Sequence, residues 1–421
     1  MPWRLAGLTT RGWCLLAAGV AAALCAVLVD ERDLLRVAAF VMMLPLLASV
    51  VVGHRHGRLR ATRDLAPTRV TVGGDCQAHL TLHGTGRWLG GRLLVEDVVP
   101  PALGVSCRAV VARPPRLGSV KVSYPLRPVQ RMVHSLGPLI VRVADPLGLA
   151  EYRPTVAVHS RLIVIPAVVS LTGLPGGGEL GAGEAAGGRA GSGPGQEAVV
   201  VRSYRQGDDL RKVHWRTTAR RDELMVRVEE WPERGGVTVL LDHRDAAHRG
   251  SGPTSSLEYG VSLAASVYVH LRQHGQQVRL VTADGMVLAG AADRTDHTID
   301  TALDALAALR PADQRDLASG PALAGRQDVV AVLGALEPVA IEQLLAHRPR
   351  GRRSHAVLLD VAAWSLAGNG FAVPDAADPA PAARLLAAAG WSVAVARPEQ
   401  PLSLVWDQLC SSSRSKLQVP R

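Results

Sequence analysis

The sequence predicts a multidomain protein made of a transmembrane helical hairpin, a β-sandwich and an open α/β sheet. Two uncharged apolar runs within the first 60 residues predict the hairpin. Short segments rich in Val, Leu and Thr, split by Gly and Pro, predict the sandwich. From residue 236 onward, strand-like and helix-like segments alternate, which is typical of an α/β sheet. A chain of 421 residues is long enough for two or three such domains.

The N-terminal segment, residues 1–60, holds the apolar runs at 13–29 and 37–53. Each run is close to the lower limit of about 17 residues for a helix that spans a bilayer. A secretory signal peptide would end in a cleavage site with small residues, which this segment lacks, and a second apolar run would not follow it. We therefore predict a two-pass protein of the cell membrane, with the lipid bilayer as one partner.

The charges that flank the two runs predict the orientation. The loop between the runs, residues 30–33, is mainly acidic. The basic residues on the other side of the membrane are Arg4, Arg11, Arg55, Arg58, Arg60 and Arg63. Because Lys and Arg accumulate on the inner side, we expect both termini and all soluble domains to be cytoplasmic.

Residues 67–168 form the predicted β-sandwich, with strand-like runs at 69–72, 79–82, 93–95, 120–122, 139–143 and 162–165. No catalytic spacing of His, Asp or Cys occurs there, so we interpret this part as a scaffold or docking surface. Residues 171–196 are dominated by Gly, Ala, Ser and Pro and predict a flexible loop. The net charge of +10 favours an anionic partner such as lipid headgroups, nucleic acid or an acidic protein face.

A dense polar block at 197–235 follows the loop. Its distinctive positions are Tyr204, Gly207, Asp208, Asp209, Arg211, Trp215, Thr218, Ala219 and Arg220. The block resembles the signature of the bacterial domain of unknown function 58 family, in which a tyrosine, a Gly-Asp pair, an Arg, a Trp and a Ser/Thr-Ala-Arg recur at these spacings. Two earlier segments, Gly137-Pro138-Leu139 and Asp-Pro-Leu-Gly-Leu at 145–149, are similar to the β-rich domain of that family.

The block also has a physical interpretation. Gly207 permits a tight turn, Asp208 or Asp209 can cap a short helix, and Trp215 can anchor the segment in a neighbouring core. Residues 202–227 hold eight basic and four acidic side chains, a net charge of +4. A structural clasp, a protein-docking surface and a nucleic-acid site are all compatible with this pattern, and we rank them in that order.

The α/β domain is predicted at 236–410 and is followed by a tail at 411–421. Strands are expected at 237–242, 278–282, 286–288, 328–333, 356–360 and 392–395, and helices at 257–273, 296–309, 338–347 and 381–389. The Ala-Asp-Gly turn at 283–285 makes the second and third strands a hairpin, so the domain resembles a von Willebrand factor A domain. No G-x-G-x-x-G follows the first strand, and no dinucleotide or other cofactor is predicted.

The first strand ends at Asp242. Metal-binding domains of the resembled type carry Asp-x-Ser-x-Ser at this point, but Arg244 and Ala246 replace the two serines here. Because a guanidinium has no lone pair for a cation, we predict that no metal binds and that Asp242 pairs with Arg244 or caps the next helix. No Ser/His/Asp or Cys/His set is recognisable, so no catalytic residue is assigned and no enzyme activity is predicted.

The family resemblance implies an association with MoxR-type AAA+ ATPases. We therefore predict a membrane-anchored scaffold or adaptor that binds such an ATPase, and other proteins of a membrane complex, during protein assembly. The default docking site is the crevice at the carboxyl ends of the parallel strands, with Asp242 at its centre. The alternatives are a hydrolase with a site near Asp242 and a nucleic-acid binder that uses the Arg-rich block; nucleic acid is the less favoured partner.

Overall fold

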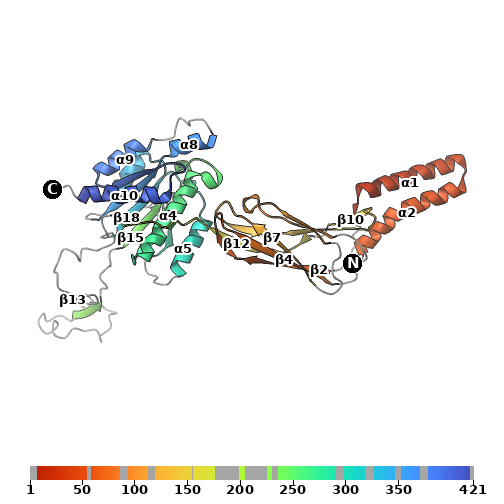
Figure 1. The fold of residues 1–421 in the computed structure, drawn as a ribbon, viewed down its shortest axis with the longest axis horizontal. Coiled ribbons are helices and arrows are strands. Elements are labelled where there is room, and N and C mark those ends of the chain that lie inside the picture. The colour runs from red at the N-terminus through yellow and green to blue at the C-terminus, as the bar shows by residue number, and fades with distance from the viewer. Residues whose placement is uncertain are drawn as a thin grey trace. The chain divides into compact units, whose positions relative to one another are not determined.

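The computed structural model divides the chain into two compact units, Met1–Ile165 and Pro166–Arg421 (Figure 1). It describes residues 7–54, 58–85, 93–111, 119–153, 155–175, 199–203, 225–229, 236–290, 297–317, 327–346, 352–369 and 378–417. The centre of the predicted signature block, 204–224, and most of the Gly-rich loop lie outside these ranges.

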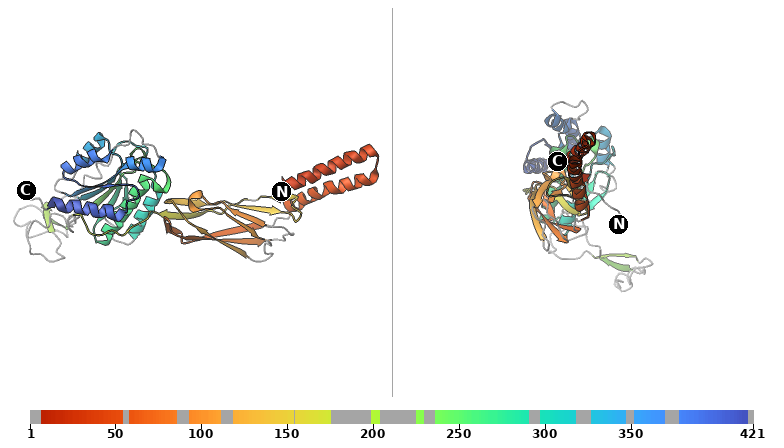
Figure 2. Two further views of the ribbon diagram at one scale, coloured as in Figure 1. Left: turned by 45° about the horizontal axis from the view of Figure 1, so that its top comes forward. Right: turned by 90° about the vertical axis from the view of Figure 1, so that its right-hand side faces the viewer.

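Two apolar helices, α1 (Thr10–Val29) and α2 (Arg32–His54), pair as a hairpin (Figure 2). The Thr9 hydroxyl accepts a hydrogen bond from Gly12 N at 3.2 Å and so caps α1, while Asp30 ends it in the left-handed region. The two helices approach closely at Gly19, where an added Cβ would lie 2.5 Å from Met42 Cγ. Both predicted apolar runs lie inside these helices.

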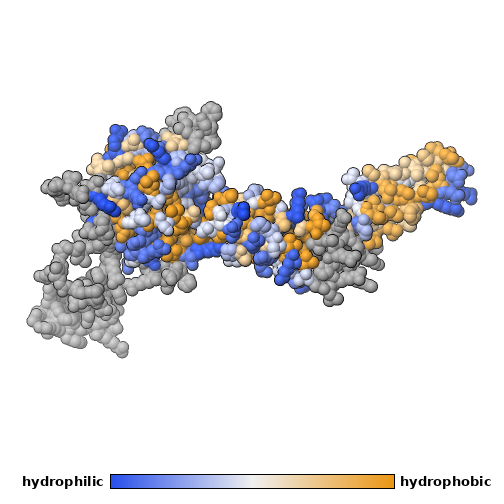
Figure 3. Space-filling view, viewed as in Figure 1, coloured by the Kyte–Doolittle hydropathy of each residue, from blue (hydrophilic) through white to orange (hydrophobic). Residues whose placement is uncertain are grey.

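The surface of the hairpin distinguishes a membrane anchor from a pair of core helices. Both helices are long and apolar enough to cross a membrane, and only 17% and 22% of their apolar windows are buried. A core helix of a soluble protein would be mostly buried, whereas Leu28 and Phe40 face outward and the hairpin surface is apolar (Figure 3). The two helices therefore suggest membrane association.

Apart from the hairpin, the described residues of the first unit form three sheets. One holds β2 (Arg58–Ala66), β4 (Cys76–Thr85) and β7 (Ser119–Leu126). A second runs in the order β1 (Gly7–Leu8), β10 (Ala150–Tyr152), β9 (Leu139–Ala144), β5 (Leu93–Asp97) and β6 (Cys107–Val111), with β11 (Thr155–Val156) also on β9. The third holds β3 (Arg69–Thr71), β12 (Ser160–Ile165) and β8 (Met132–Leu136). Leu80 and Leu82 share one buried cluster with Val95 and Val141, so the first two sheets pack on each other.

The β-rich part of the first unit that follows the hairpin begins earlier than the sequence predicts. The expected start was residue 67, but β2 pairs with β4 from Arg58 onward. The reason is that charged residues interrupt β2 at 58, 60, 63 and 64 and leave no apolar run, so its strand character comes from pairing with β4 rather than from its own hydrophobicity. Arg63, counted above as a charge flanking the membrane, is buried inside this unit.

The second unit contains an open α/β sheet, as predicted. Its strands lie in the order β17 (Val287–Ala289), β16 (Val278–Thr282), β15 (Val237–Leu241), β18 (Asp328–Leu333), β19 (Ser354–Leu359) and β20 (Ser392–Ala396). All neighbouring pairs in this order are parallel except β16 and β17, which form the antiparallel hairpin expected from the turn at 283–285. Gly285 adopts φ 85° in that turn, which favours glycine.

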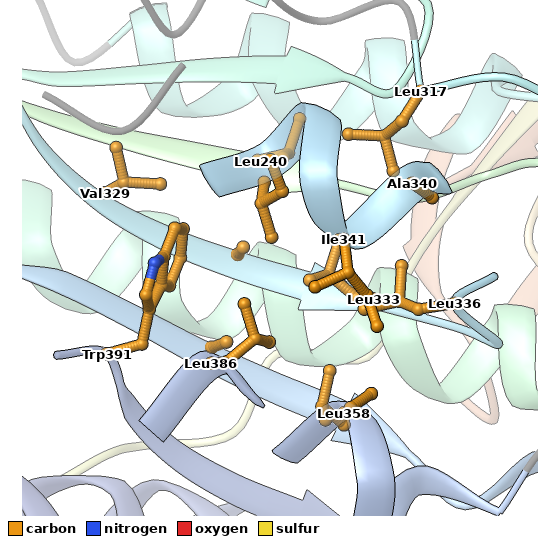
Figure 4. Packing of buried hydrophobic residues seen from close by; sticks show 14 residues of the cluster. Leu240, Leu317, Val329, Leu333, Leu336, Ala340, Ile341, Leu358, Leu386 and Trp391 are labelled. Carbon is orange, nitrogen blue, oxygen red and sulfur yellow. The ribbon is translucent and has the colours of Figure 1, made fainter. Parts of the chain in front are cut away.

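Helices cover both faces of this sheet. Leu240, Leu333 and Leu358 point into one cluster with α7 (Pro338–Ala346) and α9 (Pro379–Ala388), as Figure 4 shows. The alternate residues Leu241 and Leu359 face Gly260 of α4 (Ser256–Gln273) on the other side. Every residue of β15 is therefore buried, as expected for a central parallel strand.

Several elements differ from the prediction. Helices α5 (His297–Ala308), α7 and α9 were expected, but α8 (Val361–Asn369) and α10 (Leu402–Leu417) were not. The predicted tail from residue 411 continues α10, whose residues Val405, Trp406 and Leu409 are buried at helical spacing. The serine-rich end of α10 obscured this pattern. Strands β13 (Val199–Ser203) and β14 (Met225–Glu229) lie within the predicted signature block and pair on either side of its centre, 204–224.

Candidate functional site

The candidate site lies where the strand order of the α/β sheet reverses. β15 comes first in the sequence among the strands of this sheet, and its two neighbours, β16 and β18, lie on opposite sides of it. Such a switch point opens a crevice at the carboxyl ends of the strands, which is where open α/β sheets bind ligands. Asp242 directly follows β15, and Gly334 directly follows β18.

The guanidinium of Arg244 pairs with the carboxylate of Asp242. Arg244 Nε donates to Asp242 Oδ1 at 2.9 Å, and Arg244 Nη2 donates to Asp242 Oδ2 at 2.8 Å. The same two oxygens accept from the backbone N–H groups of Arg244, at 3.1 Å, and Gly334, at 3.3 Å. A carboxylate offers about four acceptor sites, so these four donors occupy them. The predicted pairing of Asp242 with Arg244 is thus observed.

The guanidinium is held on its other side by backbone carbonyls. Arg244 Nη1 donates to Arg315 O at 2.7 Å, and Arg244 Nη2 also donates to Ala335 O at 3.2 Å. Burial alone would lower the pKa of Arg244, but the hydrogen bonds and charge of Asp242 outweigh it and raise the pKa. The arginine is therefore a permanent cation that joins β15 to the segments after α5 and β18.

Asp242 cannot act as an exposed docking or metal-binding group in this arrangement. Its side chain is 0% exposed, so a partner would have to displace Arg244 to touch it. The residues present do not fit a divalent cation, because the carboxylate has no unused lone pair and its neighbour is already positively charged. Docking at this edge of the sheet remains a prediction, and it would have to use side chains around Asp242.

His248 links the loop after β15 to the start of α4 by two hydrogen bonds. Its Nε2 lies 2.9 Å from Asp242 O and its Nδ1 lies 3.1 Å from Ser256 Oγ. A carbonyl can only accept, so Nε2 carries the proton and Nδ1 accepts from the serine hydroxyl. Ser256 Oγ in turn accepts from Arg249 N at 2.9 Å. Burial lowers the pKa of His248, which keeps the imidazole neutral in this network.

This histidine predicts an acid-sensitive loop. Below about pH 6.5 the unfolded chain binds a proton at His248 that the folded state excludes, so the free energy of unfolding falls as the pH drops toward the folded pKa, by about 1.4 kcal/mol per pH unit. Hydrogen exchange of residues 237–248 at about pH 7.5 and pH 5.5 measures this loss. His270 also has a lowered pKa, so His248→Gln is the reference: the part of the loss due to His248 should vanish in that variant. An unchanged pH dependence would contradict the assignment.

Gly334 is a site residue that the motif analysis missed. An added Cβ would lie 2.2 Å from Ala247 O, within a close approach that lets Ala335 N donate to the same carbonyl at 2.8 Å. The only sequence signal is a glycine directly after a buried strand.

We expect Gly334→Ala to destabilise the α/β unit by about 1–3 kcal/mol, because the two loops must separate. Urea unfolding of the full chain in detergent, followed through exchange of residues 236–250, measures the change. Gly290→Ala is the matched control, since no atom lies within 4 Å of its added Cβ. Equal effects of the two substitutions would show that the close approach at Gly334 has no energetic role.

Exposed acidic and apolar side chains surround the buried pair. Asp245 and Glu337 are exposed, and Met286 is 48% exposed on the β16–β17 turn. Asp284 in that turn lies 3.9 Å from His243 Nε2. Burial alone would raise the pKa of Asp284, but hydrogen bonds from Thr282 and Met286 N lower it. We call Asp245, Asp284, Met286 and Glu337 the rim.

Among the predicted site residues, Asp242 is the one that falls within the described part of the chain. The others lie outside it: Tyr204, Gly207, Asp208, Asp209, Arg211, Trp215, Thr218, Ala219 and Arg220. Their roles as clasp or docking surface stay predictions.

Comparison with known families identifies the region that contains these residues. The family model described as "Protein of unknown function DUF58" matches residues 200–354, from β13 to the start of β19. The family resemblance inferred from the signature block is therefore confirmed. No curated protein matches the chain.

Solved structures give weaker likenesses. A β-glucosidase, EmGH1, from Erythrobacter marinus is 12% identical with a TM-score of 0.14, over 24% of this chain and 16% of that one. β-Glucosidase 3B from Thermotoga neapolitana, solved with α-D-glucose, is 14% identical with a TM-score of 0.13, over 26% of this chain and 17% of that one. This chain spans about a sixth of each enzyme, and scores this low carry no argument about fold or activity.

Proposed function

We propose that this chain, a member of the DUF58 family through residues 200–354, is a membrane-anchored and cytoplasm-facing scaffold or adaptor that acts by binding proteins. The observation that carries the proposal is the filled crevice of the α/β sheet. Asp242 and Arg244 form a buried ion pair at the place where open α/β sheets bind a ligand. What this edge offers to a partner is therefore the surface of the rim.

The domain types support the same function. The strand order β17-β16-β15-β18-β19-β20, with an antiparallel β17, supports a von Willebrand factor A-like assignment for the α/β unit. Two sheets with a shared apolar core support a β-sandwich in the first unit. Neither assignment supplies a catalytic group, which favours binding over catalysis.

The orientation rests on basic residues next to the two apolar helices. Arg11 and Arg60 are exposed at the end of the hairpin that joins the sheets of the first unit, which together we call the β unit. The turn between the helices instead carries Asp30 and Glu31. This distribution supports a cytoplasmic location for both soluble units. Arg63 no longer contributes to it, because its charge is neutralised by Asp97.

A MoxR-type AAA+ ATPase is the proposed partner, and the family resemblance is its support. The test is affinity capture of the detergent-solubilised full chain from its native membranes, followed by binding of the identified ATPase to purified variants. We expect Met286→Arg and Glu337→Arg to weaken ATPase binding at least tenfold, which corresponds to about 1.4 kcal/mol. Leu385→Arg is the control. Leu385 of α9 is similarly exposed, at 54%, but lies on the β20 side of the sheet, whereas Met286 lies on the β17 side.

Each outcome has a clear meaning. An ATPase that binds the control variant but not the rim variants supports the adaptor function and locates its surface. Equal loss with all three variants would contradict the rim as the docking site. Capture without any AAA+ ATPase would contradict the proposed partner, and the hydrolase and nucleic-acid alternatives would then be assayed directly.

A further inference from the structure

The helical hairpin is attached to the β unit at one turn, residues 145–149. The Thr9 hydroxyl donates to Gly148 O at 2.6 Å, and Thr9 N donates to Leu149 O at 3.0 Å. The short strand β1 then pairs with Glu151 and Ala150 of β10. At Gly12 an added Cβ would lie 2.1 Å from Leu149 O, so the first turn of α1 touches the backbone of this turn.

Helix α2 meets the same edge. Val52, near its carboxyl end, forms a buried cluster with Ala150, against which Ala48 and Tyr152 also pack. Both ends of the hairpin that leave the bilayer are therefore fixed to β10. A flexible tether would leave the β unit free to tumble, whereas these contacts hold the turn beside the point where α1 and α2 emerge.

The turn itself is rigid and exposes a leucine. Asp145 accepts hydrogen bonds from Leu147 N at 2.9 Å and from Ala150 N at 2.7 Å, and Gly148 adopts φ 68°. This leaves the side chain of Leu147 61% exposed at the tip. A rigid turn that presents an apolar side chain next to two apolar helices fits the acyl boundary of a bilayer.

Basic side chains lie at the same end of the unit. Arg11 is exposed at the start of α1. Arg60 is exposed on β2, which begins four residues after α2 ends, and faces solvent opposite His83 of β4. Lys121 is exposed on the neighbouring strand β7. Positive charges beside an apolar anchor are the arrangement that attracts anionic lipid headgroups.

We propose that Leu147, Arg11, Arg60 and Lys121, which we call the collar, form a lipid-contact surface. Leu147 enters the headgroup–acyl boundary, and the three cations contact the phosphates of anionic lipids. The collar rests on the proposed membrane anchor and deepens it, because it makes the β unit a second, peripheral membrane contact. The anchor then holds the β unit at a defined tilt and height above the bilayer.

The test uses the full chain in vesicles and an environment-sensitive fluorophore on single cysteines. Accessible cysteines are first removed by Cys14→Ala, Cys25→Ala and Cys107→Ala, and Cys76 and Cys410 are buried. The probe is then placed by Leu147→Cys in the collar, by Val20→Cys within α1, and by Val105→Cys as the control. Val105 is also highly exposed, at 90%, but it lies at the other end of the sheet from Leu147. It follows Asp97, the last residue of β5, which pairs with Leu139 at the start of β9, whereas the turn 145–149 follows the end of β9.

We expect nitroxide-labelled lipids to quench the probe at 147 several-fold more than at 105, and more strongly in vesicles of phosphatidylcholine with phosphatidylglycerol than in phosphatidylcholine alone. Arg60→Glu should reduce the effect of phosphatidylglycerol. Arg127→Glu, a charge reversal at a 78% exposed side chain on the other end of the sheet, should not.

The outcomes separate the two proposals. If the probe at Val20 is not quenched, the membrane anchor itself is wrong, and the collar falls with it. If Val20 is quenched but 147 behaves like 105, the anchor stands and the collar is overturned. Quenching at 147 that ignores both phosphatidylglycerol and Arg60→Glu would overturn the role of the cations.

Discussion

Replacing Asp242 with alanine is expected to destabilise the α/β unit by about 3–5 kcal/mol, because the change leaves the Arg244 guanidinium buried without its counter-charge. Arg244 has a side-chain exposure of 5%, so water cannot replace the lost carboxylate. The backbone N–H of Gly334 also loses its acceptor. Hydrogen exchange of peptides from β15 and β18, measured on the full chain in detergent, reports the loss.

Two further variants make this prediction specific. Arg397→Ala removes a pair with Asp360 whose arginine is 74% exposed, and it should cost less than about 1 kcal/mol. Asp242→Leu combined with Arg244→Met removes both charges, and it should be less destabilising than Asp242→Ala alone. If the double variant is less stable than Asp242→Ala, the pair stabilises the α/β unit through its hydrogen bonds rather than through charge compensation.

This instability limits how Asp242 can be used in functional experiments. A variant that loses partner binding because its loops have opened would look the same as one that lost a docking group. Substitutions on the rim avoid the problem, since Met286 and Glu337 are exposed. A hydrolase centred on Asp242 would first have to expose a carboxylate that now accepts four hydrogen bonds.

The sequence predicted best those features that are local or buried on two sides. Strands β16 and β18 have the expected bounds. β18 is buried along its whole length, and such a parallel strand is a near-continuous apolar run in the sequence. The pair of Asp242 and Arg244 was also predictable, since the two residues are only two positions apart along one loop. By contrast, β2 carries no apolar run, and the serine-rich end of α10 resembles a tail.

The ion pair of the first unit shows why other features could not be predicted. Arg63 and Asp97 are 34 residues apart, on strands of different sheets, and each looks like an ordinary surface charge in the sequence. Only the register of β2 against β4, and of β5 against β9, brings them together. A buried charge pair across two sheets is a property of the packing, which sequence periodicity does not encode.

That pair gives the second large prediction: Asp97→Ala should destabilise the first unit by about 3–5 kcal/mol. Arg63 is 0% exposed on its side chain and donates to both oxygens of Asp97. Its Nη1 also donates to Leu136 O at 2.9 Å and to Val158 O at 3.3 Å, so one guanidinium joins β2 to three other segments. Without the carboxylate, this charge would be buried unpaired.

Asp97→Ala also removes the hydrogen-bond acceptor of Tyr124, which adds to the loss of stability. Its hydroxyl donates to Asp97, and burial together with that carboxylate raises the pKa of the phenol, which therefore stays protonated as a donor. Tyr124→Phe removes this single hydrogen bond and should cost about 1 kcal/mol, well below Asp97→Ala. Exchange of peptides from β2, β5 and β7 measures both variants, while peptides of the α/β unit serve as an internal reference.

The matched control for Asp97 is Asp75→Ala. Asp75 pairs with Arg127 at 3.2 Å, but both side chains are more than 70% exposed, so its removal should cost less than about 1 kcal/mol. Equal effects at 97 and 75 would mean that burial does not set the strength of the pair. A large effect that extends to the α/β peptides would contradict the independence of the two units, since each has its own buried core.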